Sequence, residues 1–600
     1  MRELKIADMW AANPVVLEIL LQCRTVEDAR DRLYSYFKDL EKELYYKRVD
    51  LHALEKMNVR WCLKVLNNTL VPKNEKLAEF SVVEYLWKLA HDEPVDEEPS
   101  QGFIYEFKHL FKGILGHSEL YSKTGIVPDK DLPPFLKMHD RPAANERSKF
   151  LENEAEVIWK NIRRFPTGLD EKTIKKRQEN RRRILKVEGA SEEDWNDYNW
   201  QLKHVARNSQ TLGSWVPLTD EELEGIDIAT KNHIPFGATP YYASLMDNET
   251  SRKFDYSIRA QVIPPTSYAK LMAEHRTDRK AQMDFMKESD TSPIDLVTRR
   301  YAQVAILKPY NTCSQICVYC QRNWEVDEVL SPKALASKEK IQEALDWYRD
   351  QKGIFDILIT GGDPLVMKDE TLKWILDDIA SMDHIIRIRI GSRTPVVLPM
   401  RYTENLVDLL LSYHESPRRE LCIVTHFQHP YEVTPEAQEA VQKLKGKGVC
   451  FYNQQVFTVE NSRKFETSAL RIALRQIGVD PYYLFYMKGK KGMGMYRAPV
   501  ARLLQELKEE SRFLPGLSRT DEPVFNVPRL GKCHLRAWQD HDVISILPDG
   551  RRIYEFQPWE KNLVAVRPYI QKDISIHDYL LEMEDRGEKY EDYKNIWWYY

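Results

Sequence analysis

Residues 304–322 read VAILKPYNTCSQICVYCQR, an apolar run followed at once by a cysteine-rich loop. The run Val304–Leu307 predicts a buried strand. Behind it, Cys313, Cys317 and Cys320 have the spacing C-x₃-C-x₂-C, and no fourth cysteine lies nearby in the sequence. Zinc sites and ferredoxin-type clusters usually take four protein ligands. Three thiolates therefore indicate a [4Fe–4S] cluster that leaves one iron open to another ligand.

From about residue 300 onward, short β-rich runs alternate with amphipathic helical segments. This alternation is typical of parallel strands joined by right-handed crossovers. Six such strands suit a barrel or most of one, in which chemistry takes place at the carboxyl ends of the strands. The expected strands are Val304–Leu307, Phe355–Thr360, Ile385–Ile390, Leu421–Phe427, Val449–Phe457 and Pro481–Met487.

The cysteine loop resembles that of the radical S-adenosylmethionine superfamily. In that superfamily the methionyl amino and carboxylate groups bind the open iron, and an electron from the cluster produces a 5′-deoxyadenosyl radical. The stretch ILITGGDP (357–364) resembles a second element of these enzymes. There, Gly361 and Gly362 would let the backbone approach the methionyl amino group, beside Asp363. In isolation, a tight turn after a strand would explain the same residues.

Longer stretches narrow the resemblance to the lysine 2,3-aminomutase family. It covers about residues 185–560, more than half of the chain. Enzymes of this family combine the radical with pyridoxal phosphate, move the substrate nitrogen from Cα to Cβ, and regenerate S-adenosylmethionine. The stretches are EEDWNDYNWQLKH (192–204), TPYYASLMD (239–247), IGSRTPVVLP (390–399), THFQHP (425–430) and PYYLFYMKGKKGMGMYRAP (481–499).

The resemblance implies an α/β fold. Its centre would be a radical-SAM partial (β/α)6 barrel, with a large helical N-terminal region and a C-terminal segment that carries the lysine for pyridoxal phosphate. A β-hairpin is expected around Asp549-Gly550. The expected domains are a helical accessory region of unknown role (1–165), the helical N-terminal part of the aminomutase core (166–295), the barrel (296–515), and the lysine segment with hairpin and tail (516–600).

Pyridoxal phosphate needs a lysine to hold it covalently. By resemblance, that lysine is Lys532, after Gly531 in NVPRLGKCH (526–534), although this turn has fewer glycines and one residue less than in the family. Arg300 and Tyr301 match a pair near the cofactor phosphate. The family's second arginine falls at Val304, so we expect phosphate binding to be partly rebuilt.

Arg322 matches the arginine that binds the substrate α-carboxylate, a task suited to a bidentate guanidinium. Four more residues are expected at strand ends, where the family contacts S-adenosylmethionine: Ser392, Arg393, His426 and Gln454. Polar residues at strand ends also cap loops, so this assignment rests on the resemblance.

The side-chain pocket argues for an acidic substrate. Lysine-specific members bind the substrate ammonium with two aspartates, and the matching positions here are Lys488 and Asn526. Two like charges about 4 Å apart at an effective dielectric constant of ~20 repel each other by about 4 kcal/mol. This repulsion would weaken binding of the substrate close to 10³-fold. An acidic side chain would instead be neutralised by Lys488. The run PTGLDE…RRRIL (166–185) also resembles the glutamate 2,3-aminomutase branch, so the predicted reaction interconverts L-glutamate and β-glutamate (3-aminoglutarate).

Other interpretations stay open at this point. Lys488 could point to solvent beside Lys490 and Lys491, with specificity set elsewhere. The substrate could then be lysine, another acidic amino acid or a different amino acid. From another class, the chain could be a radical enzyme whose mutase site has been repurposed, although such a site would not need Lys532 and Arg322.

The tail after residue 568 contains no cysteine, whereas lysine-type members bind a structural zinc there, so no zinc is expected. Its aromatic end, Trp597 to Tyr600, could pack at a subunit contact, dock on its own chain or fray. The basic run KTIKKRQENRRRILK (172–186) is expected to be a solvated helix face.

Composition limits the partners. Lys and Arg number 88 against 92 Asp and Glu, a net charge of −4, so no strong positive field favours nucleic acid or an anionic membrane. No apolar run approaches the ~18 residues of a membrane span, and the N-terminus is a poor signal peptide. We therefore expect a cytoplasmic homo-oligomer that acts on a small amino acid with an external one-electron reductant.

Overall fold

The computed structural model describes residues 1–48, 50–120, 132–249, 253–278, 283–322, 324–326, 328–488 and 494–600. The chain forms two compact units, and each is assembled from segments that are distant in sequence. Unit 1 comprises Met1–Lys160, Ala498–Phe513 and Cys533–Tyr600, and unit 2 comprises Asn161–Arg497 and Leu514–Lys532. The candidate site lies in unit 2.

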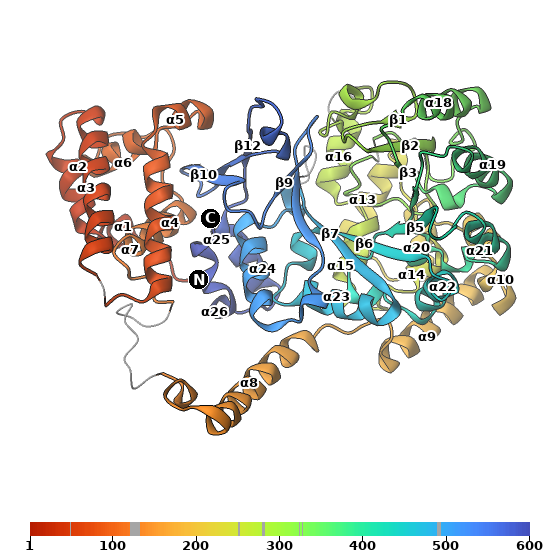
Figure 1. The fold of residues 1–600 in the computed structure, drawn as a ribbon, viewed down its shortest axis with the longest axis horizontal. Helices are drawn as coiled ribbons and strands as arrows, with labels where there is room; N and C mark the ends of the chain where they lie inside the picture. The colour runs from red at the N-terminus through yellow and green to blue at the C-terminus, as the bar shows by residue number, and fades with distance from the viewer. Residues whose placement is uncertain are drawn as a thin grey trace. The chain divides into compact units, whose positions relative to one another are not determined.

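The centre of unit 2 is a sheet of parallel strands (Figure 1). All six expected strands are present, with ends that differ by a few residues from the predicted ones. They are β2 (Val304–Tyr310), β3 (Asp356–Gly361), β4 (Arg387–Gly391), β5 (Glu420–Thr425), β6 (Cys450–Phe457) and β7 (Val479–Tyr486).

The strands lie in sequence order, each parallel to the next. Three further strands extend the sheet: β1 (Val297–Thr298), antiparallel to β2, β8 (Glu522–Asn526), parallel to β7, and β9, which begins at Lys532. Among the described residues β2 does not pair with β7, so the barrel is partial, as expected.

Each crossover helix buries one stripe against these strands. In α18 (Lys338–Asp350), Ser337 caps the helix by accepting a hydrogen bond from the Lys340 backbone, and a stripe with helical spacing is buried: Ile341, Ala344, Leu345 and Tyr348. The other main crossover helices are α19 (Asp369–Ala380), α21 (Glu404–Leu411), α22 (Pro435–Lys445) and α23 (Glu466–Ile477). Buried residues of both strands and helices belong to one hydrophobic core.

Helices before the sheet complete unit 2. They are α9 (Glu171–Glu188), α10 (Glu192–Asn196), α11 (Tyr198–Lys203), α12 (Ser209–Trp215), α13 (Asp220–Lys231), α14 (Pro240–Ala243), α15 (Tyr256–Val262) and α16 (Thr266–Glu274). The basic run lies on α9, and most of its cations are exposed as expected. Arg177 is an exception, because it is buried and forms an ion pair of 2.8 Å with Glu436.

Unit 1 joins N-terminal helices to the C-terminal part of the chain. Its first helices are α1 (Ile6–Trp10), α2 (Pro14–Gln22), α3 (Val26–Tyr46), α4 (Ala53–Thr69), α5 (Pro72–Ala78), α6 (Val82–Ala90), α7 (Gln101–Gly113) and most of α8 (Asp140–Ile162). Its later elements are α24 (Val500–Phe513), β10 (His541–Ile546), β11 (Arg552–Phe556), β12 (Tyr569–Lys572), α25 (Ile576–Asp585) and α26 (Tyr590–Tyr593).

The units do not follow the expected domain ranges, because the N-terminal helices bury their core against residues after 532. Arg552 on β11 forms a buried two-bond ion pair with Glu106 on α7, at 2.8 and 2.9 Å. Trp597 is fully buried and stacks on His109. The aromatic tail is therefore docked on its own chain, and the expected hairpin, β10 with β11, forms part of the same core.

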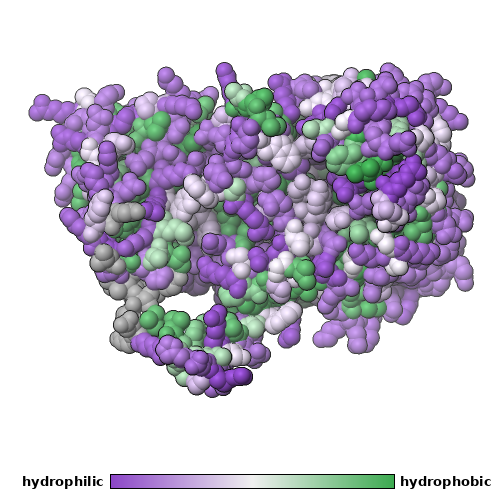
Figure 2. All heavy atoms as spheres, viewed as in Figure 1, coloured by the Kyte–Doolittle hydropathy of each residue, from purple (hydrophilic) through white to green (hydrophobic). Residues whose placement is uncertain are grey.

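Hydrophilic side chains cover most of the face seen in Figure 2. Among the residues that the structure describes, no helix is both long and apolar enough to cross a membrane.

Candidate active site

The cysteine loop follows the carboxyl end of β2 and is held by segments that precede the sheet. The backbone N–H of Ile316 donates to the Gly237 carbonyl at 3.1 Å, and that of Val318 donates to the Gln261 carbonyl at 2.8 Å. Within the loop, the Cys320 N–H donates to the Cys317 carbonyl at 3.2 Å. These bonds place the three thiols on one short, supported loop.

The three cysteines of the loop are in the reduced form that iron binding requires. In the described part of the chain, no three His, Cys, Asp or Glu side chains are placed to bind one ion. The cysteines form no disulfide, and burial raises the pKa of the Cys313 and Cys317 thiols. Both thiols would lose their protons on binding iron.

The Gly-Gly-Asp turn after β3 packs directly on the start of the cysteine loop. The Gly362 N–H donates to the Tyr310 carbonyl at 2.7 Å, and the Asp363 N–H donates to the Thr312 carbonyl at 2.8 Å. A Cβ on Gly362 would lie 2.0 Å from the Thr312 carbonyl oxygen, and Gly361 has a φ of +119°. Both glycines are therefore needed for the two loops to approach each other.

Asp363 ties this turn to the end of β4. Its buried carboxylate accepts from Ser392 Oγ at 2.7 Å and from the Arg393 N–H at 2.8 Å. Burial raises the pKa of Asp363, and the hydrogen bonds from Ser392 and Arg393 oppose that rise. The expected residues Asp363, Ser392 and Arg393 thus form one connected group beside the cysteine loop.

Arg393 links a cysteine of the loop to a buried carboxylate. Its Nη1 donates to Cys317 Sγ at 2.6 Å, and its Nη2 donates to Glu432 Oε1 at 2.7 Å. Glu432 is fully buried and also accepts from Tyr242 at 2.7 Å and Gln261 at 3.0 Å. Because every partner is inside the protein, the guanidinium is fixed in place.

His426 lies at a strand end as expected, and Gln454 does not. His426 directly follows β5, whereas Gln454 is in the middle of β6 and not at its end. His426 Nδ1 donates to the Gln454 carbonyl at 3.1 Å, which leaves Nε2 as an acceptor. Burial, followed by Arg393, lowers the pKa of His426 to about 4, so the ring is neutral near pH 7.

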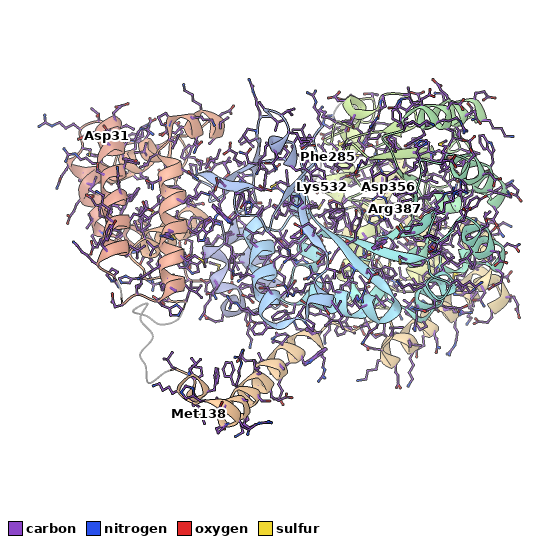
Figure 3. All side chains as sticks on the ribbon, in the orientation of Figure 1. Asp31, Met138, Phe285, Asp356, Arg387 and Lys532 are labelled. Carbon is purple, nitrogen blue, oxygen red and sulfur yellow. The ribbon has the colours of Figure 1, made fainter. Side chains whose placement is uncertain are left out.

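Figure 3 labels Lys532, whose side chain is buried. Its Nζ donates to the Tyr301 hydroxyl at 2.6 Å and lies 4.4 Å from the Tyr301 ring centre and 4.9 Å from that of Tyr483. A buried amine beside flat aromatic faces fits a lysine that holds an aromatic cofactor.

The turn before Lys532 forms without the additional glycines of the family. The Val527 N–H donates to the Gly531 carbonyl at 3.0 Å, and Arg529 takes a φ of +65°, a conformation usually adopted by glycine. Its guanidinium forms an ion pair with Asp290. The shorter turn therefore keeps Lys532 at the start of β9.

A carboxylate that the sequence reasoning did not single out lies between the predicted anion-binding residues. Glu288 is 3% exposed and lies 3.1 Å from Arg322 Nε, 3.5 Å from Lys308 Nζ and 3.6 Å from Arg300 Nη2. Burial alone would raise the pKa of Glu288, but Arg322, Lys308 and Arg300 together lower it to about 2. Lys308 also pairs with Glu325 at 3.0 Å. A third carboxylate, the buried Asp284, also acts on Arg300, so three cations face three carboxylates here.

Lys488 points toward the protein and not simply into solvent. Its Nζ donates to the Phe285 carbonyl at 3.2 Å and lies 5.7 Å from the Phe285 ring centre. Lys490 and Lys491, its alternative neighbours, lie outside the described residues. Lys488 follows β7 and Asn526 ends β8, so both lie at the carboxyl edge of adjacent parallel strands.

Three supporting residues had no role in the sequence argument: Glu288, Glu432 and Gln261. Glu432 comes two residues after the quoted stretch THFQHP, and Glu288 precedes the Arg300-Tyr301 pair by twelve positions. An acidic residue close to a recognised basic motif was the only available signal, and many surface acids give the same signal.

The sheet, its cysteine loop and the turn after β3 define a class. Residues 307–468 match the Radical SAM superfamily, whose members use a [4Fe–4S] cluster and S-adenosylmethionine. An uncharacterized KamA family protein of Methanocaldococcus jannaschii is 44% identical over 99% of this chain and 97% of its own length. The chain belongs to the KamA family, and that relative shares the helical N-terminal region as well.

Two further relatives match about half to two thirds of the chain. A glutamate 2,3-aminomutase of Clostridioides difficile is 33% identical over 64% of this chain and 86% of its own length. An L-lysine 2,3-aminomutase of Methanococcus maripaludis is 36% identical over 53% of this chain and 70% of its own length. Since the two identities are similar, overall similarity does not separate the two substrates.

Proposed function

We propose that this protein is a radical S-adenosylmethionine and pyridoxal-phosphate-dependent amino-acid 2,3-aminomutase that interconverts L-glutamate and β-glutamate. The observation that carries the choice of substrate is the positive charge that neighbouring cations place around Lys488. Burial, Arg300 and Lys287 all lower the pKa of Lys488, because each disfavours another positive charge at this position. A substrate ammonium would meet the same repulsion, whereas a carboxylate would relieve it.

Separate groups of residues would hold the cluster and the two cofactors. Cys313, Cys317 and Cys320 would hold the cluster, and Lys532 would hold pyridoxal phosphate. When bound, these groups and S-adenosylmethionine supply a hydrogen-abstracting radical and a carrier for the migrating amino group. Residues expected to bind S-adenosylmethionine are Gly361, Gly362, Asp363, Ser392, Arg393, His426 and Gln454.

Substrate orientation would depend on three contacts. Arg322 would bind the α-carboxylate, while Lys488 and Asn526 would bind the side-chain carboxylate. Arg300 and Tyr301 would bind the phosphate and ring of the cofactor. The cations that lie around Glu288 are the groups in this region that could bind anions. A substrate held at both ends presents one Cβ hydrogen to the radical, which favours migration over side reactions.

Lysine is the second candidate substrate, since lysine 2,3-aminomutases are among the similar relatives. A repurposed radical enzyme is the third candidate. For all three candidates we propose a cytoplasmic homo-oligomer that receives its electron from an external reductant.

The test is anaerobic incubation of the reconstituted protein with S-adenosylmethionine, pyridoxal phosphate, a reductant and either L-glutamate or L-lysine, followed by chromatography for the β-isomer. β-Glutamate alone is the expected product. β-Lysine would contradict the pocket argument and leave the aminomutase chemistry intact. Deoxyadenosine without either product would point to the repurposed enzyme.

Two charge-reversal variants test whether Lys488 contributes to the binding of L-glutamate. Lys488→Asp should lower kcat/KM for L-glutamate by about 10²- to 10³-fold, because it replaces an attractive charge with a repulsive one. Lys352→Asp, at an exposed lysine in the turn before β3, makes the same charge change and should leave kcat/KM unaltered.

A further inference from the structure

We infer that Glu288 is a positioning residue that holds the Arg322 guanidinium by one edge and presents its other edge to the substrate α-carboxylate. This inference rests on the proposed role of Arg322. It assigns a function to a carboxylate that belongs to no recognised motif of the chain.

The geometry separates the two edges of the guanidinium. Arg322 Nε donates to both oxygens of Glu288, at 3.1 and 3.2 Å. Among the described residues, neither Nη nitrogen of Arg322 has a hydrogen-bond partner. The two Nη nitrogens form the edge that suits a bidentate contact with a carboxylate, and it is the edge that Glu288 leaves open.

Glu288 is itself firmly placed. Its side chain is 3% exposed and also accepts from Gln321 Nε2 at 3.3 Å, and its backbone N–H donates to Asp284 Oδ1 at 2.8 Å. A buried anchor of this kind fixes the rotamer of a long arginine side chain before the substrate arrives, which lowers the entropy cost of binding.

Glu288 also contacts both arginines that are predicted to bind anions. Arg322 and Arg300, the predicted ligands of the α-carboxylate and the phosphate, both lie within 3.6 Å of its oxygens. The carboxylate separates two like charges that would otherwise repel each other across a buried space. The same side chain therefore sets the spacing between the substrate carboxylate and the cofactor phosphate.

The test compares two ligands that differ only at the α-carbon. L-Glutamate carries the α-carboxylate, and 4-aminobutanoate is the same molecule without it. Both would be titrated into protein loaded with pyridoxal phosphate, without S-adenosylmethionine, while the absorbance of the bound cofactor is followed. The wild type should bind L-glutamate more tightly than 4-aminobutanoate, because only L-glutamate reaches Arg322.

Glu288→Ala should weaken L-glutamate binding on the order of tenfold or more. It should change 4-aminobutanoate binding by less than about twofold. Glu288→Gln keeps an oxygen for Arg322 Nε and should restore part of the lost affinity. Glu222→Gln serves as the matched control, since Glu222 is also buried and paired with an arginine, Arg259, at 3.2 Å.

Equal weakening for both ligands would overturn the inference, because it would mean a general loss of structure. Unchanged L-glutamate affinity in Glu288→Ala would overturn it as well, as would equal wild-type affinity for the two ligands. If glutamate binding depends on Glu288 and the wild type forms no β-glutamate, the inference stands and only the proposed reaction fails.

Discussion

Lys488, the proposed contact for the substrate side chain, would make substrate binding sensitive to pH. Burial, and then the neighbouring cations Arg300 and Lys287, lower the pKa of Lys488 to about 7. Below this pH the side chain carries a charge that can pair with a carboxylate, and above it that charge is lost. The pairing energy for an acidic substrate should therefore decrease as the pH rises through about 7.

The first prediction concerns this decrease. In wild-type protein, kcat/KM for L-glutamate should fall as the pH rises above about 7, by up to about tenfold per pH unit. Lys488→Arg should remove most of the fall, because a guanidinium stays charged at these pH values. The measurement is a pH profile of kcat/KM for both proteins, and parallel profiles would contradict the assignment.

At the residue scale, residues within recognised motifs could be predicted from the sequence, whereas the carboxylates that hydrogen-bond to them could not. The cysteines, Arg322 and Lys532 stand in stretches whose residue types and spacing indicate a chemistry. Glu288 and Glu432 act by accepting hydrogen bonds from arginines that are distant in sequence, Arg322 and Arg393. Nothing local distinguishes such a carboxylate from a solvated one.

At the element scale, the site depends on how closely the turn after β3 approaches the loop after β2. The two segments share backbone hydrogen bonds from Gly362 and Asp363 to carbonyls of the residues that lead into the cysteine loop. The position of the thiols is thus set by a neighbouring strand as well as by their own.

The second prediction tests that approach. Gly362→Ala should displace the cysteine loop, because the added Cβ would lie 2.0 Å from the Thr312 oxygen and 2.4 Å from its nitrogen. Reconstituted protein should contain less than about half the iron and sulfide of the wild type, since a backbone clash of this size cannot relax locally. Gly353→Ala, where an added Cβ meets nothing within 4 Å, is the control. Full iron content in Gly362→Ala would refute the argument.

Strands with a repeating apolar pattern could be predicted, and short or irregular ones could not. All six barrel strands follow the alternation with helices. β1 has only two residues, and β8 contains a proline, so neither produces a clear pattern. Gln454 was expected at a strand end by resemblance to the family, although the predicted strand Val449–Phe457 already contained it, and it lies in the middle of β6.

At the scale of the whole molecule, unit 1 depends on the last residues of the chain. Trp597 is fully buried, stacks on His109 with ring centres 4.8 Å apart, and offers its carbonyl to Arg552 at 2.9 Å. The aromatic tail is therefore part of the core of unit 1.

The third prediction follows from this burial. Trp597→Ala should lower the free energy of unfolding of unit 1 by about 3–5 kcal/mol, the cost of removing a buried tryptophan. Trp538→Ala is the control, since Trp538 is 61% exposed, and it should cost less than about 1 kcal/mol. Hydrogen exchange of the full-length protein would locate the loss, and equal effects of both variants would contradict the docking of the tail.

The division into units could not be predicted, because its evidence lies in pairs that are very distant in sequence. Glu106 and Arg552 are 446 positions apart, and each alone resembles an ordinary surface charge. The expected domain ranges were instead based on changes in sequence pattern along the chain. Such changes indicate secondary structure and do not show which segments share a core.

The three-segment composition of unit 1 has a consequence for biosynthesis. Residues 1–160 are translated before unit 2, yet the partners that complete their core lie after residue 532 and are translated after it. Unit 2 emerges in between and can form its sheet while translation continues. The apolar faces of the nascent N-terminal helices therefore stay incompletely covered until those later segments emerge, and chaperones can bind such exposed faces.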